Sequence, residues 1–150
     1  MKRIATALAA IAVSVSALSG AWGDGSFEND DALDWVSQCT QSACVDTISA
    51  TLNNAINAKF IEASEGAAVV AASEVIAAAS GKPSPSLPPE LSKWLKKQPS
   101  AKLIELAPKA RQALARVKDP KASELQQLWA EGKKNEWAKR IQELEARLAK

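Results

Sequence analysis

Residues 67–79 restrict the fold more than any other stretch, because nearly every side chain in AAVVAASEVIAAA is small and apolar. A helix that is apolar on all of its sides is buried in a protein core. We therefore predict a helix from about Ser64 to Ser80, ended by Gly81 and placed at the centre of the fold. Its small side chains would let neighbouring helices approach closely.

Helical periodicity covers most of the sequence on either side of this stretch. A core-facing stripe at steps of three and four predicts a helix over residues 43–59, formed by Val45, Ile48, Leu52, Ala55 and Ile56. An earlier helix should begin after an N-cap at Asn29 or Asp30 and end near Cys39. Later helices are predicted at residues 90–97, 100–118 with a break or kink near Pro108, 123–131 and 135–149. No segment shows sustained strand alternation, so we predict an all-α fold, a compact single-domain bundle of about seven helices over residues 20–150.

Residues 82–89, KPSPSLPP, predict an extended connector in the middle of the chain. The connector separates an acidic half from a basic half, so a two-part arrangement is one interpretation. We favour a connector that wraps a single domain, because each half alone is small.

The first 19 residues have the features of a cleavable signal peptide. A basic start at residues 1–3 precedes an uncharged apolar run, Ile4 to Leu18, which is shorter than the roughly 20 residues that span a bilayer. Small residues at positions 17 and 19 place cleavage after Ser19, or one or two residues later. The alternative is an uncleaved anchor or a buried N-terminal helix. We predict export to the periplasm or beyond, with no membrane span in the mature chain.

Charge is distributed unevenly along the mature sequence. Residues 20–81 hold nine acidic residues and one basic residue, for a net charge of −8, whereas residues 82–150 hold sixteen basic and eight acidic residues, for +8. Such asymmetry can indicate a nucleic-acid or membrane partner. We favour two halves that complement each other within one fold. Export and the glutamates interspersed in the basic half argue against a nucleic-acid partner.

The chain contains no histidine and no tyrosine. Histidine is the usual general base near neutral pH and a frequent metal ligand. Catalytic triads that need histidine and zinc sites that contain it are therefore excluded. The two cysteines cannot complete a four-thiolate metal site, and no cofactor or metal is indicated.

The stretch that follows the signal carries the most specific motif, GAWGDGSFENDDALDW at residues 20–35. Segments that support it include Glu65-Gly66 before the Ala-rich helix, the run from Gly81 to Glu90, and the tryptophans near the end of the chain. The sequence resembles the bacterial family known as domain of unknown function 4259, over almost all of residues 20–150. The resemblance implies a fold and no reaction.

Four residues are candidates for binding or function. Asp30 and Asp31, in an acidic cluster with Glu28 and Asp34, could help to bind a hard cation, although helix capping explains Asp30 and Asp31 without a ligand. Glu74 lies in the predicted buried helix, where a carboxylate needs a partner such as Asp31, Arg111 or Arg116. Its role is either a structural salt bridge or a functional carboxylate. Trp22 is the tryptophan best placed, in a loop, to line a binding groove.

Cys39 and Cys44 are the only cysteines of the chain. In an oxidising compartment such a pair favours a disulfide. Residues five apart in one continuous helix are too far apart for this bond, so it requires a turn within residues 40–43.

Two hypotheses for the function follow. The first is a small exported helical protein that binds another macromolecule, a protein, in an interaction or immunity-like role and not as an enzyme. The second is an enzyme or small-ligand binder that uses the buried carboxylates, Glu74 with Asp30 and Asp31. A flat apolar patch lined by tryptophan would favour the first, and a deep pocket that holds Glu74 with either aspartate would favour the second. The sequence does not specify an oligomeric state.

Overall fold

The fold is all-helical. A computed structural model of the chain describes residues 23–132 and 136–149, so Trp22 and the predicted signal peptide lie outside the described residues. Within these ranges the helices are α1 (Asp30–Gln41), α2 (Cys44–Asn57), α3 (Ala63–Ala79), α4 (Pro89–Leu95), α5 (Ser100–Ile104), α6 (Ala107–Val117), α7 (Glu124–Ala130) and α8 (Glu136–Leu148). Apart from one isolated bridge, the described residues form no strand.

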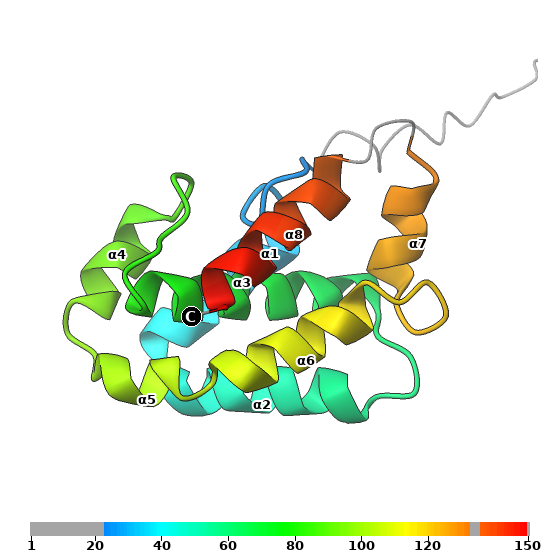
Figure 1. The fold of residues 1–150 in the computed structure, drawn as a ribbon. Coiled ribbons are helices and arrows are strands. Elements are labelled where there is room, and N and C mark those ends of the chain that lie inside the picture. Colours follow the sequence, from blue (N-terminus) through cyan, green and yellow to red (C-terminus); the bar gives the residue numbers. More distant parts are fainter. Residues whose placement is uncertain (1–22, 133–135, 150) are drawn as a thin grey trace, which may run out of the picture.

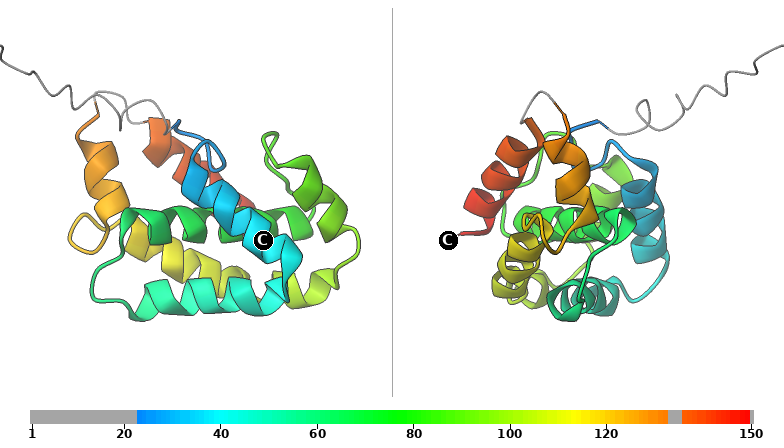
Figure 2. Two further views of the ribbon diagram at one scale, coloured as in Figure 1. Left: turned by 180° about the vertical axis from the view of Figure 1, so that it is seen from behind. Right: turned by 90° about the vertical axis from the view of Figure 1, so that its right-hand side faces the viewer.

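The Ala-rich helix α3 occupies the centre of the fold, as its sequence predicts. Every residue from Val69 to Ala77 is buried, and α3 packs against each of the other seven helices of the described chain. The views from the front and the side show α2 and α6 below α3, with α8 crossing above it and α1 on the far side (Figures 1 and 2). Small side chains allow this number of neighbours, because they let helix backbones approach closely.

The ends of α3 are fixed by local contacts. At its start, Glu62 and Glu65 form a reciprocal capping box. At its end, Gly81 has a φ of 80°, and the amide of Lys82 donates to the carbonyl of Ala77 at 3.0 Å. Glycine adopts this left-handed conformation without a steric penalty, so the predicted stop at Gly81 is confirmed.

One predicted helix is divided in two. Residues 100–118 form α5 and α6, with Glu105 and Leu106 between them. Pro108 lies in the first turn of α6, where its missing N–H costs nothing. The described part of the chain forms eight helices, in agreement with the prediction of about seven, and the break predicted near Pro108 separates two of them.

Contacts between distant loops complete the frame. Ile61 is fully buried and pairs with the segment before α7: its amide donates to the carbonyl of Ala122 at 2.8 Å, and its carbonyl accepts from the amide of Glu124 at 3.0 Å. The indole N–H of Trp35 donates to Thr51 Oγ1 at 3.0 Å, which joins α1 to α2. A single cluster of buried apolar side chains runs through the described chain, from Phe27 to Leu148.

Candidate functional site

The loop of the opening motif folds back on itself before α1. The amide of Gly23 donates to the carbonyl of Glu28 at 3.0 Å, and the amide of Gly25 donates to Glu28 Oε2 at 2.9 Å. A Cβ at position 23 would overlap the side chain of Glu28, which would have to move away from its hydrogen bond with Gly25. Phe27 is buried, and it anchors the loop in the core.

Glu74 lies under this loop with its carboxylate fully engaged. Arg147 in the last turn of α8 donates from both terminal nitrogens, at 2.7 Å to Oε2 and 2.8 Å to Oε1. Ser26 in the motif loop donates its hydroxyl to Oε1 at 2.7 Å. The Glu74 side chain is only 3% exposed, so the predicted burial is confirmed. The partner is Arg147, and not Asp31, Arg111 or Arg116, because the C-terminal helix crosses α3 at this point.

A polar hollow of about 260 Å³ lies above Glu74. Its described walls come from the motif loop, the Pro-rich connector and α8, and are lined by Asp24, Gly25, Ser26, Glu28, Glu74, Ser84, Pro85, Ser86, Arg140, Glu143 and Arg147. Asp30 and Asp31 are not among the lining residues. Of the three carboxylates predicted to act together, only Glu74 lines the hollow.

The two aspartates lie at the start of α1. Asp30 is exposed and Asp31 is half-buried, in the first turn of the helix. The N-cap is Asn29, whose Oδ1 accepts from the amide of Ala32 at 2.8 Å. Carboxylates at this position interact favourably with the helix dipole, which accounts for both aspartates without a ligand. Among the described residues, no group of three or more acidic or cysteine side chains is placed to hold a metal ion.

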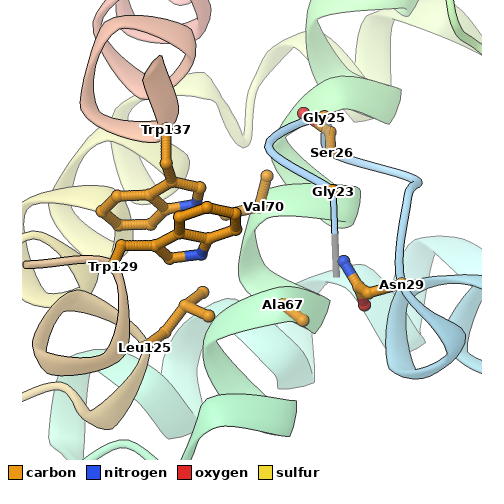
Figure 3. Close-up of a pocket in the computed structure, with 9 residues that line it drawn as sticks. All are labelled: Gly23, Gly25, Ser26, Asn29, Ala67, Val70, Leu125, Trp129 and Trp137. Carbon is orange, nitrogen blue, oxygen red and sulfur yellow. The ribbon is translucent and has the colours of Figure 1, made fainter. Parts of the chain in front are cut away.

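Two tryptophans stack beside the motif loop. The rings of Trp129 on α7 and Trp137 on α8 are parallel, with centroids 6.2 Å apart. Figure 3 shows the pair next to Leu125, across Ala67 and Val70 of α3 from the Gly23–Ser26 loop. The crevice between the tryptophan pair and the loop has a volume of about 10 Å³, which is room for no more than about one water molecule. Trp137 is buried and Trp129 is half-buried, so the pair fills space between α7, α8 and α3.

Cys39 and Cys44 lie at disulfide distance, which supports the predicted bond. Cys39 lies in the last turn of α1 and Cys44 is the first residue of α2, with their Cα atoms 4.5 Å apart. Both residues are buried. The turn that the bond requires lies at Ser42 and Ala43, because α1 continues to Gln41, two residues beyond its predicted end near Cys39.

A second, larger groove lies at the C-terminal end of α8. Its volume is about 750 Å³, and it is lined by the end of α3, the α5–α6 junction and the end of α8: Ser80, Lys82, Ile104, Glu105, Ala107, Pro108, Arg111, Arg147, Leu148 and Ala149. Ile104 is 43% exposed in this groove. Sequence reasoning did not identify the groove, because its residues come from three segments far apart in the chain. The sequence feature that could have indicated the groove is the adjacent pair Leu103 and Ile104. Leu103 is buried in this five-residue helix, and Ile104 is left exposed.

Comparison with known proteins identifies the family to which the chain belongs. In residues 23–132 and 136–149, none of the helices combines the length and the apolar character that a bilayer crossing requires. Neither a search of curated proteins nor a search of solved structures found a significant match. The model of one protein family, described as a domain of unknown function (DUF4259), matches residues 20–140. The chain therefore belongs to the DUF4259 family.

Proposed function

We propose that this protein acts by binding another protein, and that the groove between α3, α5–α6 and α8 is the binding surface. The observation that carries the proposal is the exposed side chain of Ile104, which lies in a groove of about 750 Å³ beside Ala107, Pro108 and Leu148. Contiguous apolar surface that is exposed next to polar residues is characteristic of interaction sites.

The shape of the groove favours a macromolecule over a small ligand. Pockets for small molecules bury most of the ligand surface. Here the lining residues Lys82, Ile104, Pro108 and Arg111 are all exposed, and Leu148 is the buried large apolar residue of the wall. Such an open surface can contact an extended segment of a partner along its length.

The polar hollow above Glu74 supports a second candidate, a small-ligand binder or enzyme. It has the size and the polar lining for a small polar molecule. Both oxygens of Glu74 already accept hydrogen bonds, from Arg147 and Ser26, so this carboxylate is better placed to hold the fold together than to take a proton or a ligand. We therefore place this candidate second.

We further propose that the protein works after export, with a partner in the cell envelope or outside the cell. The basic start and apolar run of residues 1–19 support export, and so does the disulfide, since such bonds persist in oxidising compartments. An immunity-like role, in which a small protein binds and blocks another, would be one use of the groove.

Comparing partner capture by two matched variants tests the proposal. Ile104 and Leu33 are equally exposed, at 43%, but Leu33 lies on α1 and does not line the groove. A partner from native envelope fractions should be retained by the wild-type protein and by Leu33→Glu, and lost by Ile104→Glu. Circular dichroism would confirm that both variants are folded. Equal capture by all three proteins would contradict the proposal.

A further inference from the structure

We infer that the groove recognises an acidic segment of the partner protein that also inserts an apolar side chain. This inference rests on the proposed function and specifies the chemistry of the partner. It follows from the charged side chains that line the groove, which are a separate observation from the exposed apolar side chain of Ile104.

Basic side chains dominate the charge of the groove. Lys82, Arg111 and Arg147 line it, with Glu105 as the acidic residue among the described lining residues. Within the described chain, neither Lys82 nor Arg111 lies within ion-pair distance of a carboxylate. Both side chains are exposed, and complementary charge steers association and fixes register.

Arg147 has a different part in the groove. Its guanidinium is held by Glu74 in a bidentate pair, and it also donates to the carbonyl of Lys82 at 3.2 Å. The charge of Arg147 is thus neutralised inside the protein, while the side chain shapes the wall. Attraction of an acidic partner depends on Lys82 and Arg111.

Lys82 is positioned close to the end of α8. Its amino group donates to the carbonyl of Ala149 at 3.2 Å, next to the buried Leu148. Arg111 lies on α6, one turn after Ala107 and Pro108. Because both cations line the same groove as Ile104, a segment that carries carboxylates close to an apolar residue matches the surface.

Binding of a short labelled peptide, with leucines flanked by glutamates and aspartates, tests this inference. Fluorescence anisotropy with the mature, disulfide-bonded protein should detect binding that weakens as salt increases. The same peptide with lysine in place of each acidic residue should bind at least about fivefold more weakly, as expected for the loss of one favourable surface ion pair or more.

Variants of the protein assign the effect to the groove. Lys82→Glu and Arg111→Glu should each weaken binding of the acidic peptide by about fivefold. Glu105→Gln should strengthen it, because a like charge is removed. Lys121→Glu changes an exposed cation outside the groove and should leave affinity unchanged.

The outcomes separate the two levels of the proposal. One such outcome is that acidic and basic peptides bind equally well, with binding lost in Ile104→Glu and unchanged in Arg111→Glu. That result would contradict an acidic partner and leave the groove as the binding surface. No peptide binding, together with equal partner capture by Ile104→Glu and Leu33→Glu, would overturn both. Binding to phosphatidylglycerol vesicles that needs Lys82 and Arg111, without peptide binding, would replace the protein partner by an anionic lipid surface and overturn the inference.

Discussion

Glu74 and Arg147 form a bidentate ion pair between the middle of α3 and the last turn of α8. The two nitrogen–oxygen distances are 2.7 and 2.8 Å, and the residues are 73 positions apart in the chain. Ser26 joins the same carboxylate. One buried side chain on the central helix thereby holds both the motif loop and the C-terminal helix that forms a wall of the groove.

Glu74→Gln should destabilise the protein, because the guanidinium of Arg147 would lose its charged partner in a largely buried position. We expect a loss of about 1–3 kcal/mol in the free energy of unfolding, the range for leaving such a group unsatisfied. Urea denaturation of the disulfide-bonded protein measures it. Glu143→Gln is the control, since Glu143 is half-exposed and 3.9 Å from Arg140, and should change stability by less than about 1 kcal/mol. Unchanged or higher stability in Glu74→Gln would instead indicate a functional carboxylate.

Removal of the disulfide should also lower stability. The double variant Cys39→Ala and Cys44→Ala opens a short loop, and the entropy model gives a loss of about 2 kcal/mol. Alanine is preferred to serine here because both positions are buried. Reductant should destabilise the wild-type protein by a similar amount and leave the double variant unaffected. Two free thiols in unreduced protein from the native source would contradict the bond.

The contribution of the α1 N-cap to the stability of the protein can be measured separately. Asn29→Ala removes the side-chain acceptor for the amide of Ala32, at an expected cost of about 1 kcal/mol. Asn29→Asp keeps an acceptor and should retain most of the stability. Asn54→Ala, at an exposed position within α2, is the matched control and should change stability by no more than about 0.5 kcal/mol. Equal effects of the two alanine substitutions would argue against the cap.

Export predicts a specific N-terminus. Protein isolated from the cell envelope of the native host should begin at Gly20 or within two residues of it, as measured by mass spectrometry of the intact chain. Recovery of the chain with Met1 from the cytoplasm would contradict both export and the proposed location of the partner.

Local features of the fold could be predicted from the sequence. The central helix followed from its all-apolar composition, and the stop at Gly81 and the turn between Cys39 and Cys44 followed from residue chemistry within a few positions. The break near Pro108 was also predicted, although α5 and α6 prove to be separate helices. These features depend on neighbours in the chain, which a sequence shows directly.

Long-range relationships could not be predicted in the same way. The need of Glu74 for a partner was evident from its apolar surroundings, but several arginines were available, and only the path of α8 across α3 selects Arg147. The groove at Ile104 likewise depends on how three separate segments meet. Periodicity identifies which face of a helix is buried, and it does not determine which distant helix covers that face.

Site-specific photo-cross-linking in the native host tests the proposed binding surface most directly. Benzoylphenylalanine would replace Ile104 in the groove, Leu33 on α1 as the equally exposed control, and Ser86 at the polar hollow. We predict a discrete protein adduct from position 104 and none from positions 33 and 86. An adduct from position 86 without one from position 104, or equal adducts from positions 104 and 33, would contradict the groove as the binding surface.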